Sequence, residues 1–538
     1  MQGVALDMML RGIAIQQGVR ADGVAELVAK RDKAMALLDR LANAIWGPDR
    51  VVVVDKTETW ETPVGARGQP LKPRRKIVRT ERIEERPLGL NANSDKQLLA
   101  FFNIALQYPV HHAIRKRPGG IKVRTPSADD KALRKWADRR SKGPGINSRD
   151  RAFSHVHFAQ PFVELIQTIR SCDKALEVLT FPLRPNGRGH CRYNPAGTKT
   201  GRWSSSDDAF GYGRNFQNID EHYRRQFCAD DGYWFVSTDY EQAESRLVAA
   251  LVWACTGDDT YWRACESSDL HTLVCRMTWP ELEWTNDDKA NRAIADKVYP
   301  GLDGFTYRDV AKRLGHGTNY WGTAFGIAAA VGIPVELVTD FQKRYFRAFP
   351  AIAQWHKWVA DFIRHNHYLD TPLGRRLYLF GRVWEDSAIR EAIAAVPQST
   401  IAELLNYSMH RVWERAHRPA TDPNHLNLQL LLQNHDAFAF QVPCTADLPT
   451  TLAAVRSELE TSIPIKSHLT DEIRHLTIPA EFVTGYNWGY ADRGTDPSKW
   501  HFKDGNPDGL RKWSGAELRR RKQSARTSPQ DWLSRKMA

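Results

Sequence analysis

Hydrophobic residues recur with a helical period over residues 1–47. Leu27, Ala34, Leu38 and Leu41 form an apolar stripe between charged positions, which is typical of an amphipathic helix. A second helix is predicted from NANSDKQLLAFFNIAL, where an Asn or Ser serves as N-cap. Two further helical patterns follow in ADDKALRKWADRR and FVELIQTIRSCDKALEVL. The pattern therefore predicts a mainly helical N-terminal region.

Residues 48–87 interrupt this helical pattern. VVVVDKT is typical of a strand, whereas GARGQPLKPRRKIVRTERIEER is rich in proline and charge. We expect an irregular, charged insertion here.

Two later apolar runs lead to solitary aspartates. WFVST is predicted to be a strand that delivers Asp239, and a helix follows at once. LQLLLQ and AFAFQV form a predicted hairpin with His435 and Asp436 at its tip. Two fixed carboxylates suit a pair of divalent cations, which catalyse nucleotidyl transfer in many enzymes.

A cationic strip lies between these two segments in the sequence. Arg308, Lys312, His316 and Tyr320 recur every fourth residue and therefore lie near one face of a predicted helix. Such a strip suits a triphosphate, although an amphipathic surface helix with two basic residues is common.

Composition narrows the class of protein only a little. The chain has 538 residues, is 42% apolar and carries a net charge of +13, which suits a folded protein with a polyanionic partner. Its seven scattered cysteines lack a metal-binding spacing and indicate reduced thiols of a cytoplasmic protein, in the host cytoplasm if it is viral. Neither a signal peptide nor a long apolar membrane span is predicted.

The ordered segments TKTGRWSSS, VSTDYEQAES, RDVAKRLGHGTNYWGTAFG and LQNHDAFAF resemble motifs of the family A DNA polymerases. This resemblance implies an α+β, right-hand polymerase fold with thumb, palm and helical fingers around an antiparallel sheet. The expected parts are the thumb and N-terminal helical region at 1–190, palm at 191–250, fingers at 251–370, palm at 371–490 and a basic tail at 491–538. That tail carries 12 Lys/Arg against 6 Asp/Glu, which suits a solvated tail and a duplex-gripping tail equally.

The resemblance also implies roles for individual residues. Two Mg²⁺ ions, or Mn²⁺ in their place, are expected on Asp239, the carbonyl of Tyr240 and Asp436, with Lys312 as a third catalytic residue that protonates pyrophosphate. Glu244 is the expected steric gate against a ribose 2′-hydroxyl. Expected nucleotide-binding residues are Arg308, Lys312, His316, Tyr320, Glu244, His271 and Gln242. Expected contacts to primer-template DNA are Arg202, Asn218, Arg390, Gln398 and His435.

Several positions depart from the family pattern. His316 stands where relatives place Phe or Tyr, and Trp321 where they usually have Gly. Ala394 replaces a frequent Asn, and Ala437 replaces the Glu that often follows the second Asp. We expect reduced redundancy at the metal site but retained activity.

The resemblance therefore predicts a DNA-templated DNA polymerase that extends a primer with dNTPs, most plausibly in phage replication. The segment before the thumb-like helix is far too short to form an exonuclease domain. We therefore expect no 3′→5′ exonuclease, and a separate exonuclease or other replisome proteins are candidate partners. Two alternatives stay open: a single-subunit RNA polymerase, and a catalytically weak or inactive DNA-binding relative.

Overall fold

The computed structural model describes residues 1–46, 49–63, 68–70, 72–86, 89–116, 122–137, 158–267, 269–300, 302, 305–491 and 505–513. Within these residues the chain forms two compact units, one made of Met1–Gln17 and Phe181–Ala538, the other of Gly18–Thr180. We call them the sheet unit and the helical unit. Met1–Gln17 thus belongs with the sheet unit, although the sequence analysis assigned it to the thumb region. None of the described helices combines the length and apolarity needed to cross a membrane.

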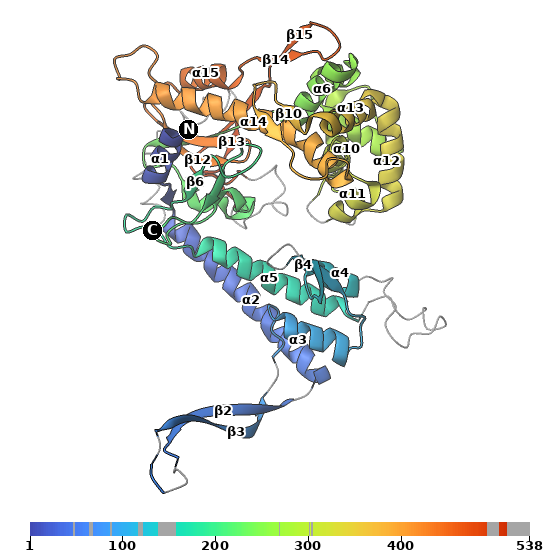
Figure 1. Cartoon of the computed structure of the whole chain (residues 1–538). Coiled ribbons are helices and arrows are strands. Elements are labelled where there is room, and N and C mark those ends of the chain that lie inside the picture. The colour runs from blue at the N-terminus through green and yellow to red at the C-terminus, as the bar shows by residue number, and fades with distance from the viewer. Residues whose placement is uncertain are drawn as a thin grey trace. The chain divides into compact units, whose positions relative to one another are not determined.

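The helical unit is built on two long helices that run side by side, α2 and α5 (Figure 1). Ser94 caps α3 by accepting a hydrogen bond from the backbone amide of Gln97, as the sequence predicted. The elements of this unit are α2 (Gln17–Trp46), β2 (Asp49–Glu61), β3 (Arg74–Arg86), α3 (Asp95–Leu99), a π-helix (Ala100–Ala105), β4 (His112–Lys116), β5 (Lys122–Pro126), α4 (Asp130–Ala137) and α5 (Gln160–Leu179).

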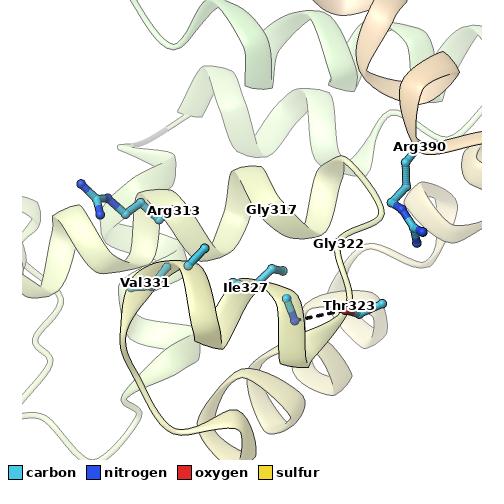
Figure 2. Close-up of a pocket in the computed structure, with 9 residues that line it drawn as sticks. Arg313, Gly317, Gly322, Thr323, Ile327, Val331 and Arg390 are labelled. Carbon is cyan, nitrogen blue, oxygen red and sulfur yellow. Dashed lines mark hydrogen bonds between the residues drawn. The ribbon is translucent and has the colours of Figure 1, made fainter. Parts of the chain in front are cut away.

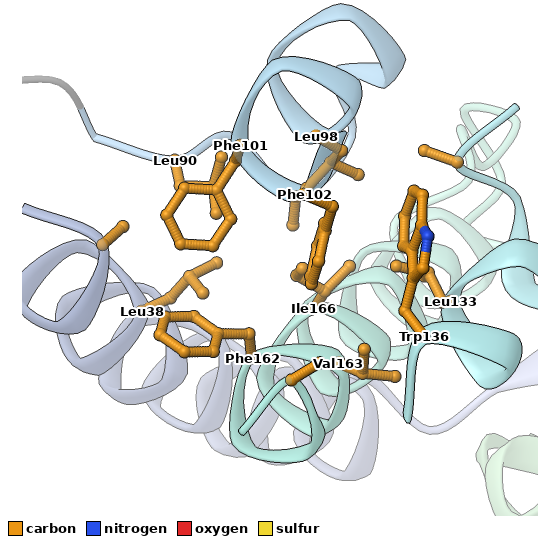
Figure 3. Close-up of a cluster of buried hydrophobic side chains, with 14 of the residues drawn as sticks. Leu38, Leu90, Leu98, Phe101, Phe102, Leu133, Trp136, Phe162, Val163 and Ile166 are labelled. Atoms are coloured by element: carbon orange, nitrogen blue, oxygen red, sulfur yellow. The ribbon is translucent and has the colours of Figure 1, made fainter. Parts of the chain in front are cut away.

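Aromatic packing holds the helical unit together (Figure 3). Phe102 stacks on Trp136 with ring centroids 4.5 Å apart, and Phe101 meets Phe162 at 5.2 Å. All four side chains are at most 4% exposed. Burial of such rings contributes several kcal/mol each, so this cluster fixes how the helices of the unit pack.

The strand predicted from VVVVDKT is confirmed, since these residues lie in β2, but the irregular insertion expected for the rest of 48–87 is wrong for most of its described length. β2 and β3 pair antiparallel in continuous register from Asp49 opposite Arg86 to Glu61 opposite Arg74. The charged run was read as irregular because it lacks an apolar alternation, but cross-strand backbone pairing does not require one.

The sheet unit centres on a five-stranded antiparallel sheet with the order β12-β13-β9-β16-β17. Its strands are β9 (Tyr233–Tyr240), β12 (Gln429–Asn434), β13 (Ala437–Pro443), β16 (Ala480–Gly485) and β17 (Arg511–Lys512). The predicted strand before Asp239 and the predicted hairpin around Asp436 are both confirmed. β17 comes from the expected basic tail; the rest of that tail lies largely outside the described residues.

Short strand pairs and helices complete the sheet unit. The pairs are β1 (Ala14–Ile15) with β8 (Phe227–Cys228), β6 (Arg192–Asn194) with β7 (Ser204–Ser206), β10 (Tyr368–Asp370) with β11 (Arg376–Tyr378), and β14 (Ile463–Lys466) with β15 (Ile473–Leu476). The helices are α1 (Gln2–Arg11), two 3₁₀ turns (Phe216–Asn218 and Glu221–Gln226), α6 (Ala243–Thr256), α7 (Thr260–Ser267), α8 (Leu270–Thr278), α9 (Asp288–Ala295), α10 (Tyr307–Asn319), α11 (Ala324–Val331), α12 (Val335–Ala348), α13 (Pro350–Asn366), α14 (Asp386–Ala416) and α15 (Leu448–Leu459).

Replacing Phe102 with Ala is expected to lower the free energy of unfolding of the helical unit by about 3 kcal/mol or more, because a fully buried ring stacked on Trp136 is lost. Hydrogen exchange of the α5 amides at increasing urea concentration measures this. Ile104→Ala, in the same π-helix but 76% exposed, is the matched control and should change the value by less than about 0.5 kcal/mol. Equal effects of the two variants would contradict the assigned core.

Candidate active site

Strand pairing brings the two predicted aspartates together. β13 lies beside β9, and Asp239 is directly opposite Ala437, the residue after Asp436. His435, in the tight turn before Asp436, adopts a left-handed backbone conformation with φ 55°. The hairpin turn therefore places the second carboxylate next to the first.

These carboxylates occupy an electrostatically unfavourable position. Asp239 is accessible to solvent, yet the protein packed around it and the charge of Asp436 raise its pKa to about 6. Burial also raises the pKa of Asp436. Its Oδ1 atom is buried and has no hydrogen-bond partner within the described part of the chain. An orphaned carboxylate oxygen beside a second carboxylate is chemically suited to a divalent cation.

Arg202 links the second aspartate to the predicted gate residue. Its Nη2 donates to Asp436 Oδ2 at 3.0 Å and to Glu244 Oε1 at 3.1 Å. Arg202 follows Gly201, whose φ is 79° and where a Cβ would lie 2.7 Å from the Arg375 guanidinium. Glycine is therefore required at position 201 by close packing as well as by its left-handed backbone.

Glu244 is held from two sides. Its Oε2 lies 3.4 Å from His316 Nδ1, while its Oε1 accepts from Arg202. Burial would raise the pKa of Glu244, but His316, with further contributions from Tyr320 and Arg202, lowers it to about 2. Glu244 is therefore an ionised carboxylate at neutral pH.

A sharp change of direction after β9 brings Glu244 into this position. Gln242 is the N-cap of α6 and has a left-handed backbone with φ 53°. Its Oε1 is buried and lacks a partner among the described residues. The Tyr240 side chain turns to the interior, donating to the Leu459 carbonyl at 3.1 Å, so the backbone of Tyr240 is what remains beside Asp239.

The cationic face of α10 forms as predicted. Thr306 and Asp309 make a capping box at its N-terminus. The helix carries Arg308, Lys312 and His316, and Tyr320 is its C-cap. The charge of Lys312 acts on Asp239 and partly counters the rise in the pKa of that aspartate.

Asp269 holds Arg308 of this helix in place, a contact that the sequence analysis did not predict. Arg308 donates to both its carboxylate oxygens, through Nε at 2.8 Å and Nη2 at 2.9 Å. Asp269 also caps α8 through the His271 amide. The ion pair between Arg308 and Asp269 joins two segments that are distant along the chain. A local sequence pattern therefore could not predict it, and only the fold reveals it.

His271 lies on α8, next to His316 of the cationic face of α10. It is 5% exposed, and its ring centroid lies 5.8 Å from that of His316. Burial, followed by the nearby charges of His316 and Arg308, lowers the pKa of His271 to about 3. It is an uncharged imidazole at neutral pH.

Two residues near the end of α10, Gly317 and Trp321, have unusual surroundings or backbone conformation. A Cβ at Gly317 would lie 2.8 Å from Ile327 Cγ1, so the glycine lets α11 approach α10 closely. Trp321 has φ 58°, a left-handed conformation that normally favours glycine. Burial, with Glu244 adding to it, raises the pKa of the adjacent Tyr320 well above its ordinary value.

A cavity of about 480 Å³ lies between α10 and α11 (Figure 2). Its lining is mostly apolar or glycine, and Arg313 and Arg390 are its two charged residues. The guanidinium of Arg390 lies 5.7 Å from the Trp321 ring centroid.

The expected DNA contacts are less closely gathered. Asn218 is exposed at the end of a 3₁₀ turn, and Gln398 is half-buried on α14 with Arg390. Neither makes a polar contact to the two aspartates within the described residues. Burial lowers the pKa of His435, which stands beside Asp436. Arg202 and His435 therefore lie at the carboxylates, and the other three lie elsewhere on the sheet unit.

Comparison with known proteins shows which family the chain matches. Residues 74–490 match the family model described as DNA polymerase family A. The chain is 29% identical over 339 residues to a thermostable DNA polymerase I of Thermus filiformis, covering 60% of this chain and 36% of that protein. It is 32% identical over 273 residues to a DNA polymerase I of Chloroflexus aurantiacus, covering 48% of this chain and 25% of the relative. The matched part therefore spans 36% of the length of the first relative and 25% of the second.

A solved structure supports the fold. The chain resembles the POL domain of Pol1 from M. smegmatis, solved in complex with DNA primer-template and dNTP. The TM-score is 0.59 at 21% identity, and the match covers 90% of this chain and 69% of the other.

Replacing Asp239 with Asn is expected to stabilise the metal-free protein by about 1 kcal/mol at about pH 7.5, below the full linkage value because the side chain is accessible to solvent. The raised pKa means that the wild-type protein loses stability as pH rises through about 6. The advantage of the variant should thus fade as pH falls toward the ordinary value of 3.8. Urea unfolding in EDTA across this range measures it. Asp471→Asn, at a fully exposed side chain, should show no such trend.

Proposed function

Because the chain belongs to DNA polymerase family A, we propose that it is a DNA-templated DNA polymerase that extends a primer 3′-hydroxyl with deoxynucleotides. The observation that carries this proposal is the meeting of Asp239, on β9, with Asp436, in the turn before the neighbouring strand β13, together with the charge of Lys312 of α10 acting on Asp239. A cation site next to a phosphate-binding helix is the arrangement that nucleotidyl transfer requires.

The residues present fit a divalent cation site. Asp239, the backbone carbonyl of Tyr240 and the orphaned oxygen of Asp436 would hold the ions. Two Mg²⁺ ions, or Mn²⁺ in their place, would supply activation of the 3′-hydroxyl and neutralisation of charge on the leaving pyrophosphate.

The α10 strip binds the triphosphate in this proposal. Asp269 holds Arg308 through Nε and Nη2, and this fixes the direction of Nη1 for a phosphate oxygen. Lys312, one turn further along, neutralises the phosphates and donates a proton to pyrophosphate. His271 contributes an uncharged ring, so it hydrogen-bonds without adding charge.

Arg202 has two roles in this scheme. Without DNA it neutralises Asp436 and Glu244. In the complex its guanidinium turns to the minor groove at the primer terminus, and His435 and Asn218 support the duplex. Glu244, still held by His316, then stands against the sugar 2′ position and excludes ribonucleotides.

The unit structure supports assignment of the right-hand parts. We assign the helical unit to the thumb, the five-stranded sheet with its Asp pair to the palm, and α6–α13 to the fingers. Tyr320, at the end of α10, and Gln242 line the nucleotide side, while Arg390 and Gln398 on α14 face template and primer.

Three finer expectations stay predictions: service in phage replication, a cytoplasmic location, and the absence of proofreading, with a separate exonuclease as candidate partner. Release of single nucleotides from a mismatched 3′ end by the pure protein, unaffected by Asp239→Ala, would contradict the last of these.

Asp239→Ala and Asp436→Ala are each expected to reduce primer extension by about 10³-fold or more, because each removes a cation ligand. Gel-based extension of a labelled primer-template with Mg²⁺ measures this, and Asp471→Ala is the control. Normal extension by either site variant would overturn the proposal. Primer-independent polymerisation of ribonucleotides would favour an RNA polymerase, and tight DNA binding without turnover in Mg²⁺ or Mn²⁺ would favour the non-catalytic relative.

Glu244→Ala is expected to raise ribonucleotide incorporation relative to deoxynucleotide incorporation by about tenfold or more, because the carboxylate no longer occupies the 2′ position. Single-nucleotide insertion kinetics with dNTP and rNTP give this ratio. Glu241→Ala, shortly before it in the chain and also half-buried, is the matched control. A ratio that moves equally in both variants would argue against a gate at Glu244.

A further inference from the structure

Glu481 lies beside the candidate cation site and has no role in the scheme above. β16 pairs with β9 on the side opposite to β13, and Glu481 is directly opposite Asp239. Ala437 is opposite Asp239 on the other side. Directly opposed residues of antiparallel strands project from the same face with Cβ atoms about 5 Å apart. On the sheet face that carries Asp239, its two cross-strand neighbours are therefore Ala437 on β13 and Glu481 on β16.

The position of Glu481 is electrostatically unfavourable without a cation. Its negative charge acts on Asp239, on which the charge of Asp436 also acts. Its side chain contacts Lys512 of β17, which is 75% exposed. An ion pair with so exposed a lysine contributes little, so this contact does not offset the repulsion.

We propose that Glu481 is a third carboxylate of the divalent-cation site, turning from Lys512 toward the cation held by Asp239. It takes the place of the carboxylate that position 437 lacks, from the opposite neighbouring strand. In the described residues no three metal-ligating side chains are gathered at one point, so this role requires a rotation of the Glu481 side chain. The orphaned Oδ1 of Asp436 marks where the cation is needed.

This inference rests on the proposed function, and Mn²⁺ binding tests it without relying on activity. Free Mn²⁺ is measured by electron paramagnetic resonance in titrations of the full chain without DNA or nucleotide. Glu481→Gln is expected to weaken the tightest Mn²⁺ site by about tenfold, because one carboxylate charge is lost while side-chain shape is kept. Glu472→Gln is the matched control: it is also a glutamate paired with a basic residue, Arg474 at 2.8 Å, and should leave the affinity unchanged.

Alanine 437 provides a second, compensating variant. Ala437→Glu in the Glu481→Gln background restores a carboxylate opposite Asp239 and is expected to bring the Mn²⁺ affinity back to within about threefold of wild type. A persistent loss in the double variant would mean that Glu481 acts through something other than the cation, and would overturn the inference.

Two further variants separate this inference from the proposed function. Asp239→Asn and Asp436→Asn should each abolish the tight Mn²⁺ site. If they do and Glu481→Gln binds as wild type, only the role of Glu481 fails. If Mn²⁺ binding survives in both aspartate variants, the cation site itself fails and the inference with it.

Discussion

The arrangement of the site depends on strand pairing that holds two carboxylates, those of Asp239 and Asp436, close together. Backbone pairing of β9 with β13 places Asp239 opposite Ala437 and so brings it close to Asp436 in the turn before β13. Burial, followed by the charge of Asp436, raises the pKa of Asp239, and burial, with the charge of Glu244 adding to it, raises the pKa of Asp436. The sheet and the hydrophobic residues on its strands, such as Phe235 and Phe440, stabilise this placement. The charge of Lys312 partly counters the raised pKa of Asp239, and that of Arg202 partly counters the raised pKa of Asp436.

Strained backbone recurs around the same site. Gln242, Trp321 and His435 all have positive φ without being glycine, and each lies at an end of an element that carries a candidate functional residue. Such conformations cost about 1 kcal/mol or more each and persist only where surrounding packing enforces them. Gly317 meets a different constraint: it has no side chain, and this allows α11 to pack closely against α10.

Local sequence patterns predicted the helix and strands that carry the site. They did not predict the contacts between segments that are distant along the chain. The strand before Asp239, the hairpin around Asp436 and the α10 face follow from periodicity and turn chemistry, and all three form as expected. The bond from Arg308 to Asp269, and the position of Glu481 opposite Asp239, depend on register between distant segments, which no local pattern encodes. The strand over VVVVDKT was predicted, but its partner β3 was missed because RRKIVRTERIEER is mostly charged and lacks an apolar alternation. The N-terminal segment Met1–Gln17 groups with the sheet unit, where β1 pairs with the distant strand β8, as in Ala14 opposite Cys228, and no local pattern encodes that pairing.

The short strand β17 also has a consequence for handling the protein. It covers the outer edge of β16 through Val483 and Thr484, and the amide of Trp513 donates to the Phe482 carbonyl at 2.8 Å. A shortened protein that ended at residue 491 would leave these backbone groups unpaired along an open strand. Open edges of this kind recruit strands from other molecules and promote aggregation. Trimming the C-terminal region as a dispensable extension would therefore endanger solubility before it affected chemistry.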